Sequence, residues 1–295
     1  MYLKDEQIEF YRAQGYLLLP GLFSRAEIEV LKREVPVILA EASPGRILER
    51  DAKTVRSVYG SHLTNPIFER LTRHPRILEP SQQIVGSEAY VYQFKINAKA
   101  ASSGDVWEWH QDYVFWQRED GLPEPQLINA TVFLDEVDQY NGPILVIPGS
   151  HLGGVIDPLS NENDSKPQSK DTVTAEGAPA WTSHLTANLK YSLDQSKVDD
   201  LSRSLGVVIA AGPPGSTLFF HPNVVHGSAR NTSGSNRTLI ICTYNSVKNL
   251  PLFPKNRRPE FLVSSNFQPL EVLPDDCLQE CQQVENSFTR STCPQ

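Results

Sequence analysis

The stretch Trp107-Glu108-Trp109-His110-Gln111-Asp112-Tyr113 contains the pattern around which the rest of the chain is organised. His110 and Asp112 are two residues apart, so on a strand or at its edge their side chains would point to the same face. One imidazole and one carboxylate could then bind a single metal ion. A third ligand is available at His226, which is followed by Arg237 at the start of another apolar run. Two histidines and one carboxylate form the facial triad of non-haem Fe(II) oxygenases.

A His-x-Asp pair is weak evidence by itself, because most such short motifs are structural. The distal histidine, the trailing arginine and the strand-like runs that flank each part favour a metal site in this chain. His151 and His221 are the next candidates for the third ligand. We expect His151 to lie beside the site or on the surface, since His226 has the better sequence context.

Size and charge limit the classes of protein to which the chain can belong. With 295 residues, it can bury a hydrophobic core without disulfides or structural metals. Its formal net charge of -8 argues against general nucleic-acid binding. No apolar run approaches the roughly 20 residues of a membrane helix. The first residues are polar and acidic, so no signal peptide is expected. We expect a monomer or a homodimer that acts on a small molecule.

The four cysteines predict the cellular compartment. Cys242 lies in an apolar run and is expected to be a buried thiol. Cys277, Cys281 and Cys293 lie near the C-terminal end, lack the partners of a zinc site and are expected to be exposed. Exposed free thiols persist in a reducing environment, so the sequence predicts a cytoplasmic protein.

Short strand-like segments and Gly- or Pro-containing turns dominate the chain after its first helices. Helices are expected at 4–16, 25–42, 65–85 (interrupted at Pro75 and Pro80) and 194–205, and strands at 16–20, 54–59, 90–98, 127–134, 144–148, 185–191, 206–210, 216–220 and 238–244. This pattern predicts a single domain over 1–295 that is mainly β with flanking helices, around a double-stranded β-helix core of the jelly-roll, cupin-like type. Residues 153–187 are expected to form a long loop, either a lid or a solvated insertion, and 251–295 a tail packed along the outside.

Polar residues alternate along the strand that precedes the proposed metal ligands, where Gln93, Lys95 and Asn97 share one face. A surface strand would alternate in the same way, but the position next to the metal ligands favours a pocket. Aromatic residues crowd around His110, where they either pack in the core or keep water from a reactive metal. Arg56, on an earlier strand, is either a surface charge or a contact to a substrate anion.

Several segments resemble the phytanoyl-CoA dioxygenase superfamily of Fe(II)/2-oxoglutarate oxygenases, and the resemblance covers nearly the whole chain. The stretch from Trp107 to Tyr113, with Trp116 and residues 120–123, is similar to ectoine hydroxylases, although Trp107 and Tyr113 replace phenylalanines that are usual there. The similarity to bacterial free L-proline trans-4-hydroxylases is closer, and it lies in residues 55–58, 93–100, 104–121 and 258–262. Residues 153–187 are the least similar.

The resemblance implies an iron site made by His110, Asp112 and His226, and a site for the distal carboxylate of 2-oxoglutarate at Arg237. A guanidinium suits that carboxylate because it makes two parallel hydrogen bonds. By position, Ser228, Asn97 and Asn129 would help to hold the cosubstrate, and Gln93 and Trp116 would line the substrate pocket. The implied reaction uses Fe(II), 2-oxoglutarate and O2, with ascorbate in support, and couples hydroxylation to the formation of succinate.

The substrate that the resemblance implies is a free cyclic imino acid hydroxylated at ring carbon 4, with L-proline first and L-pipecolate second. Arg56, Gln93 and Lys95 are candidates for binding its carboxylate, and Trp116 and Tyr113 for its ammonium and ring. One methylene separates the two rings, and it is worth only about 1–3 kcal/mol in an apolar pocket. Ectoine or an acyl-CoA is an alternative substrate. A non-catalytic metal-binding jelly-roll is a further hypothesis, against which the complete triad argues.

Overall fold

The computed structural model describes residues 1–157, 185, 189–253 and 257–279, and its centre is a pair of antiparallel sheets. The larger sheet has the order β1 (Tyr16–Leu19), β9 (Thr217–Phe220), β6 (Leu127–Phe133), β11 (Arg237–Ser246), β4 (Ala89–Lys99), β3 (Val55–Tyr59) and β2 (Arg46–Leu48). The smaller sheet has the order β5 (Trp107–His110), β10 (His226–Ser228), β7 (Ile144–Val146) and β8 (Val208–Ala210). Strands far apart in sequence pair in both sheets, always antiparallel among the described residues, which confirms the predicted jelly-roll class.

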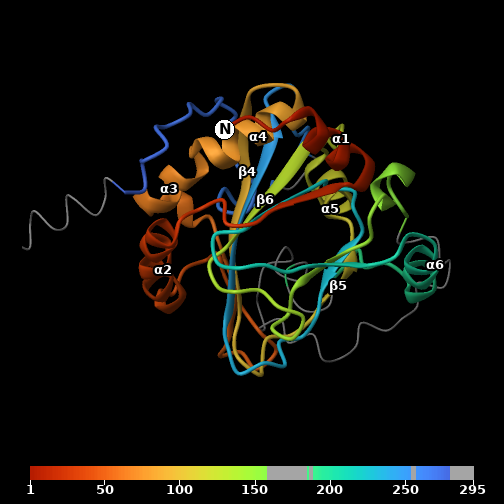
Figure 1. The fold of residues 1–295 in the computed structure, drawn as a ribbon, viewed down its shortest axis with the longest axis horizontal. Helices are drawn as coiled ribbons and strands as arrows, with labels where there is room; N and C mark the ends of the chain where they lie inside the picture. The colour runs from red at the N-terminus through yellow and green to blue at the C-terminus, as the bar shows by residue number, and fades with distance from the viewer. Residues whose placement is uncertain (158–184, 186–188, 254–256, 280–295) are drawn as a thin grey trace, which may run out of the picture.

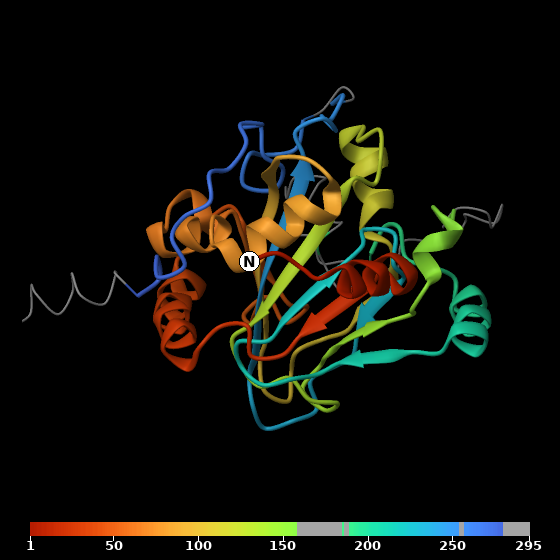
Figure 2. The same cartoon turned by 45° about the horizontal axis from the view of Figure 1, so that its top comes forward.

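The first helices cover one side of the larger sheet. Helices α2 (Arg25–Ala40), α3 (Pro66–Thr72) and α4 (Pro75–Val85) lie on the side of β4 and β6 that faces away from β5, and α1 (Asp5–Gln14) contacts β1 (Figures 1 and 2). Helix α5 (Asp112–Asp120) follows β5 directly, and α6 (Gln195–Leu205) precedes β8. Short 3-10 helices are formed by Ser61–Leu63 and Ser150–Gly153. Helix α5 is the one helix of this set that the sequence reasoning did not predict.

Helix starts follow the capping signals in the sequence. The Ser24 hydroxyl accepts from the Glu27 N–H at 3.3 Å, and the Ser24 N–H donates to the Glu27 carboxylate at 2.7 Å, which is a capping box. Proline stands at the first position of both α3 and α4, where its missing N–H costs no hydrogen bond. The segment 65–85 therefore forms two helices, and Pro80 lies inside the second.

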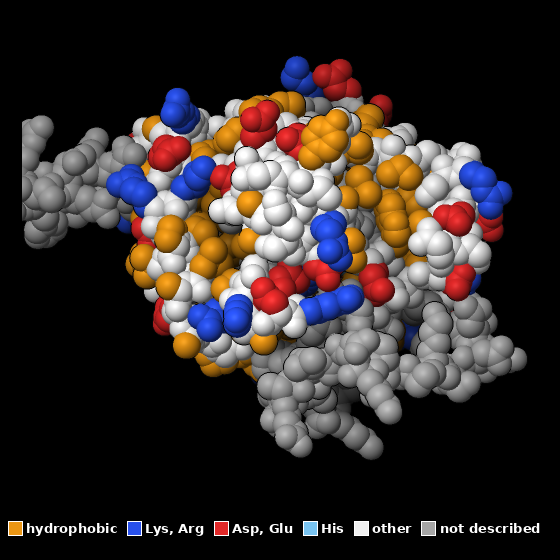
Figure 3. Space-filling view, turned by 90° about the horizontal axis from the view of Figure 1, so that it is seen from below, with side chains coloured by type: hydrophobic (Ala, Val, Ile, Leu, Met, Phe, Trp, Pro, Cys, Tyr) orange, Lys and Arg blue, Asp and Glu red, His pale blue; other side chains and the backbone are white. Residues whose placement is uncertain are grey.

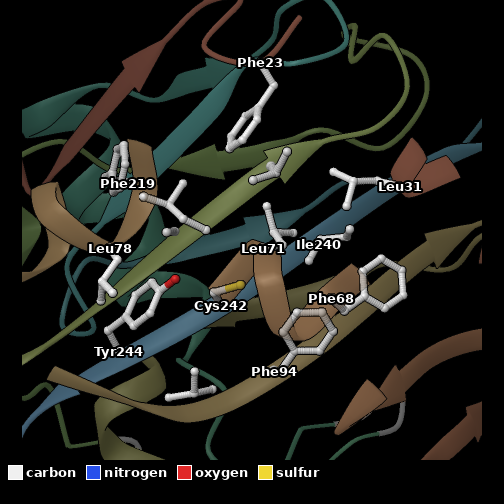
Figure 4. Packing of buried hydrophobic residues seen from close by; sticks show 14 of the residues in the cluster. Phe23, Leu31, Phe68, Leu71, Leu78, Phe94, Phe219, Ile240, Cys242 and Tyr244 are labelled. Carbon is white, nitrogen blue, oxygen red and sulfur yellow. The ribbon is translucent and has the colours of Figure 1, made fainter. Parts of the chain in front are cut away.

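Alternation along β4 and β11 divides their side chains between the core and the space between the sheets. Figure 4 shows the core side packed under the helices, with this labelled group: Phe23, Leu31, Phe68, Leu71, Leu78, Phe94, Phe219, Ile240, Cys242 and Tyr244. Cys242 is fully buried, as predicted. On the opposite face of β4, Gln93, Lys95 and Asn97 line cavities between the sheets. The predicted alternation therefore marks a pocket wall and not a solvent-exposed surface.

The C-terminal segment departs from the predicted tail along the outside. Leu262 and Val263 are fully buried, and Cys277 is also buried although it was expected to be exposed. Cys281 and Cys293 lie outside the described residues, as does most of the loop predicted over 153–187. The described residues of the strand expected at 185–191 form no strand.

The surface carries charges of both signs. On the face drawn in Figure 3, lysine and arginine side chains lie among aspartates and glutamates, with apolar atoms between them. Within the part of the chain that the structure describes, no helix combines the length and the apolar character that a membrane span requires.

Candidate active site

Three predicted metal ligands meet where the smaller sheet joins α5. His110 ends β5, His226 begins β10, and the two residues lie directly opposite each other in the antiparallel pair. Asp112 is the first residue of α5, so the chain turns between the two members of the His-x-Asp pair. His110 thus lies at the edge of the strand and Asp112 just beyond it, and the two side chains converge. One ligand atom from each of the three residues lies within 4.8 Å of the others.

Hydrogen bonds orient both imidazoles for metal binding. Nδ1 of His110 lies 2.6 Å from the Glu108 carbonyl, and Nδ1 of His226 lies 3.0 Å from the Val224 carbonyl. A carbonyl can only accept, so each Nδ1 carries the proton and each Nε2 keeps a free lone pair. The Nε2 atoms lie 3.5 and 3.7 Å from the Asp112 carboxylate. This is the tautomer that a metal-binding histidine needs, because Nε2 is free to bind the metal while Nδ1 is hydrogen-bonded to the backbone.

The environment also sets the charge of the ligands. Burial alone would raise the pKa of Asp112, but His226, His110 and Lys95 together lower it below the ordinary value of a carboxyl group. Burial, and after it the neighbouring His110, lower the pKa of His226 to about 4. At neutral pH the site therefore presents a carboxylate and a neutral imidazole, which are the forms that bind a cation. Asn129 donates from Nδ2 to Asp112 Oδ2 at 2.9 Å and so holds the carboxylate in place.

One cavity extends from the triad to a buried arginine. Arg237 is 1% exposed and lines this cavity together with Asn97 and Ser228. Its Nη1 donates to Asn97 Oδ1 at 3.2 Å, and its Nη2 donates to the Gly142 carbonyl at 2.8 Å and to Ser228 Oγ at 3.4 Å. Its Nε has no hydrogen-bond partner among the described residues. Burial, and after it the nearby Arg56, lower the pKa of Arg237 to about 9.

Arg237 thus carries a donor and a charge that a carboxylate would satisfy. Each of its hydrogen bonds in the described structure goes to a neutral oxygen. A buried donor without an acceptor costs about 1–3 kcal/mol, which a bound carboxylate would recover. The residues present therefore fit a dicarboxylate cosubstrate.

A second cavity lies on the other side of the triad and shares Lys95, Trp107 and His110 with the first. The residues that line only this second cavity are Tyr59, Gln93, Asp112, Phe115, Trp116, Leu185, Leu189 and Arg258. Gln93 donates from Nε2 to the Leu262 carbonyl at 2.9 Å, which leaves its Oε1 as an acceptor. The metal site thus lies between a cavity that ends at an arginine and a cavity with an aromatic wall.

Arg258 lines the second cavity, although the sequence analysis assigned no role to it. Its Nε and Nη2 donate to the two oxygens of Asp120 at 2.8 and 2.5 Å, and Tyr92 donates to the same carboxylate. The hydrogen bonds to Asp120 use Nε and Nη2, which leaves Nη1 as the remaining donor of a guanidinium that lines this cavity. The sequence signal for Arg258 was the resemblance to proline hydroxylases over residues 258–262. Because this segment lies far from the metal ligands along the chain, the resemblance did not by itself indicate a contact with the site.

Arg56 and Tyr113, which were predicted to contact the substrate, line neither cavity. Arg56 donates to the Glu49 carboxylate at 2.9 Å and to the Val106 carbonyl at 2.7 Å. Its guanidinium stacks on Trp107, 3.8 Å from the ring centre. The Tyr113 hydroxyl donates to a backbone carbonyl at 3.0 Å. Both terminal nitrogens of Arg56 and the Tyr113 hydroxyl thus have partners inside the protein, and a contact with substrate stays a prediction for both residues.

The three residues that were predicted to help hold the cosubstrate lie in two different places. Asn97 and Ser228 lie beside Arg237, whereas Asn129 contacts Asp112 and is not among the residues that line the Arg237 cavity. His151 and His221 lie with their ring centres 5.1 Å apart and line a different cavity next to α1. Among the described residues, the three-ligand cluster consists of His110, Asp112 and His226 alone.

Comparisons with known proteins agree with this site. A family model described as phytanoyl-CoA dioxygenase (PhyH) matches residues 11–239. L-proline trans-4-hydroxylase from Streptomyces griseoviridis is 36% identical over 274 residues, which are 93% of this chain and 96% of that protein. The ectoine dioxygenase of Stutzerimonas stutzeri is 30% identical over 284 residues, which cover 92% of this chain and 88% of that protein.

A solved structure shares the fold. EctD from S. alaskensis, determined with 2-oxoglutarate and 5-hydroxyectoine, matches with a TM-score of 0.75 and 26% identity, covering 92% of this chain and 87% of that chain. The same protein has been solved with bound Fe, and that structure matches with a TM-score of 0.74, 25% identity and the same coverage. The chain therefore belongs to the phytanoyl-CoA dioxygenase family of non-haem iron, 2-oxoglutarate-dependent oxygenases.

Proposed function

We propose that this chain hydroxylates a free cyclic imino acid, L-proline first and L-pipecolate second, with Fe(II), 2-oxoglutarate and O2. The observation that carries the proposal is the junction of two cavities at His110. One cavity ends at the buried cation Arg237, and the other is lined by Gln93, Trp116 and Arg258. The pair of cavities suits a dicarboxylate and a small zwitterion on either side of one metal ion.

The iron would be held by the Nε2 atoms of His110 and His226 and by the carboxylate of Asp112. When bound, iron and 2-oxoglutarate supply the oxidising chemistry that inserts one oxygen atom into a C–H bond. The protein supports this chemistry by holding its ligands still. Asn129 fixes the carboxylate at 2.9 Å, and backbone carbonyls fix both imidazoles.

The distal carboxylate of 2-oxoglutarate would bind Arg237, with Asn97 and Ser228 beside it. A guanidinium can present two parallel N–H groups to this carboxylate, which a lysine cannot do. The interaction is screened less than it would be at the surface, because Arg237 is 1% exposed. The cosubstrate would then extend from Arg237 toward the metal ligands.

The imino acid would lie between Trp116 and the triad. Arg258 offers Nη1 to the substrate carboxylate, and Gln93 offers Oε1 to the secondary ammonium. Phe115 and Trp116 would pack against the ring methylenes and hold one C–H toward the metal. Arg258 thus takes the role that Arg56 had in the sequence-based proposal.

Ectoine is the second candidate, because the relatives include ectoine dioxygenases 30% and 32% identical to this chain. Ectoine also combines a carboxylate with a cation in a small ring. Trp107, however, lines the substrate cavity and is larger than the phenylalanine usual in ectoine hydroxylases. The larger side chain favours the smaller imino acid.

The test is a parallel assay of L-proline, L-pipecolate and ectoine with Fe(II), 2-oxoglutarate, O2 and ascorbate. Succinate and a product heavier by one oxygen atom are measured for each compound. We expect a hydroxylated imino acid that appears in step with succinate. A hydroxylated product from ectoine alone would overturn the imino acid assignment and leave the iron chemistry in place.

We also infer a cytosolic location. Cys242 is a free thiol and fully buried, as a reducing compartment would allow. Fractionation of cells that express the protein, and light scattering of the pure protein, would test the location and the predicted monomer or homodimer.

A further inference from the structure

Lys99 is a buried lysine next to Arg237, and Arg237, but not Lys99, lines the first cavity. It is the last residue of β4 and lies directly opposite Arg237 on β11, so the two side chains share one face of the sheet. Lys99 is only 1% exposed. Its Nζ donates to the carbonyl of Ala229 and, at 3.4 Å, to the carbonyl of Ser228. The lysine therefore reaches the segment that carries a proposed cosubstrate residue.

Two glycines pack closely against the aliphatic chain of Lys99. A Cβ added at Gly104 would come within 2.7 Å of Lys99 Cβ, and one added at Gly142 would come within 2.6 Å of Lys99 Cδ. The Gly142 carbonyl also accepts from Arg237 at 2.8 Å and from Ser228 at 2.9 Å. The Lys99 side chain and the Arg237 guanidinium thus both contact Gly142.

The charged groups around Lys99 do not favour a proton on it. Its cationic neighbours are Arg237 and Arg56, and its anionic neighbours are Glu49 and Asp105. Glu49 is already paired with Arg56 at 2.9 Å, and Asp105 is paired with two other arginines at 2.9 and 3.4 Å. Burial, Arg237 and Arg56 together lower the pKa of Lys99 to about 6. A neutral amine keeps two N–H donors, which are enough for its two carbonyl partners.

We propose that Lys99 is a positioning residue that becomes the second cation of the cosubstrate site by taking up a proton when a dicarboxylate binds at Arg237. The inference rests on the proposed role of Arg237. Without the dicarboxylate, a charged Lys99 would face two arginines whose charge the nearby anions only partly offset. A carboxylate bound at Arg237 offsets the positive charge of the guanidinium and so favours the ammonium form of Lys99. The proton moves from solvent to Nζ, and no covalent bond to carbon changes.

The proposed protonation of Lys99 predicts how the affinity for 2-oxoglutarate changes with pH. The complex holds one more proton than the free protein, so 2-oxoglutarate should bind more tightly as pH falls toward the pKa of free Lys99. Between the pKa of Lys99 in the free protein and its higher pKa in the complex, the affinity should change by about tenfold per pH unit. Below the lower pKa the affinity should level off, because the lysine is then charged in both states.

The experiment is isothermal titration of 2-oxoglutarate into the anaerobic Fe(II)-loaded protein at neutral pH, in buffers with different enthalpies of ionisation. Wild type should take up about one proton more per bound 2-oxoglutarate than Lys99→Met, whose side chain is never charged. Lys99→Arg should also lose the uptake, because its side chain is always charged. Lys248→Met, which removes an exposed lysine just beyond β11, should behave like wild type.

The outcomes distinguish a failure of the Lys99 inference from a failure of the proposed function. If folded Lys99→Met or Lys99→Arg takes up as many protons as wild type, Lys99 is not the acceptor. If neither variant folds, zero uptake by the wild type would still refute the inference. An Arg237→Met variant with unchanged affinity would instead remove Arg237 from the cosubstrate site, which is a failure of the proposed function.

Discussion

Replacing Arg258 by lysine should weaken binding of the imino acid and leave binding of 2-oxoglutarate unchanged. Arg258 places two nitrogens on the Asp120 carboxylate, at 2.8 and 2.5 Å, and leaves Nη1 for the substrate cavity. A lysine has one nitrogen, so it can remain paired with the fully buried Asp120 or reach the substrate, but it cannot readily do both. The lysine should remain paired with Asp120 and not reach the substrate, because the Asp120 carboxylate is fully buried and always present.

The magnitude follows from the loss of one charge-assisted hydrogen bond. Such a bond contributes about 1.5–3 kcal/mol. At about 1.4 kcal/mol per factor of ten, the KM for L-proline should rise by roughly 10- to 100-fold. A glutamine at this position is less informative, because it would leave Asp120 uncompensated at a cost of about 3–5 kcal/mol to the fold. Lysine keeps the charge and isolates the role of the third nitrogen.

The assay compares steady-state succinate formation against L-proline and against 2-oxoglutarate in wild type and in Arg258→Lys. Arg257→Lys is the matched control, because Arg257 is adjacent in sequence and its side chain is 44% exposed. We expect a raised KM for L-proline in Arg258→Lys and an unchanged KM for 2-oxoglutarate in both variants. A folded Arg258→Lys protein with the wild-type KM for L-proline would refute the substrate pose.

Three further changes test the rest of the site. Arg237→Lys keeps the charge but loses the planar fork, so the KM for 2-oxoglutarate should rise by about tenfold or more, and an unchanged value would contradict the assignment. Asn129→Ala removes the hydrogen bond to Asp112 and should weaken Fe(II) affinity by about 10- to 100-fold, as measured by metal titration. His226→Ala should abolish turnover and weaken Fe(II) binding while thermal unfolding shows an intact fold, and full activity would require another third ligand.

The alternation of side chains between the two faces of a single strand could be predicted, because it depends only on local backbone geometry. The alternation of β4 places Gln93, Lys95 and Asn97 on one face, and that face turns toward the cavities as expected. At His110 and Asp112 this alternation is not what brings the side chains together, because the strand ends and α5 begins between them. Spacing identified the right pair, but only the fold shows that a turn brings their side chains together.

Contacts between distant segments could not be predicted from residue type alone. Arg258 reaches Asp120 across 138 positions, and this ion pair brings the C-terminal segment to the substrate cavity. Arg56 has the same chemistry as Arg258, but both of its terminal nitrogens are used within the protein. Which of two arginines keeps a nitrogen for a ligand depends on which carboxylate the fold places beside it.

Arg56 still contributes to the site through the residue on which it stacks. Its guanidinium lies 3.8 Å from the centre of the Trp107 ring, and its hydrogen bond to the Val106 carbonyl holds the backbone just before β5. Trp107 lines both cavities, so a ring fixed in this way sets the wall between cosubstrate and substrate. Because β5 continues directly to His110, the same support positions a metal ligand. In the proposed function, an arginine that lines neither cavity would therefore help to set how closely the two reactants approach the metal.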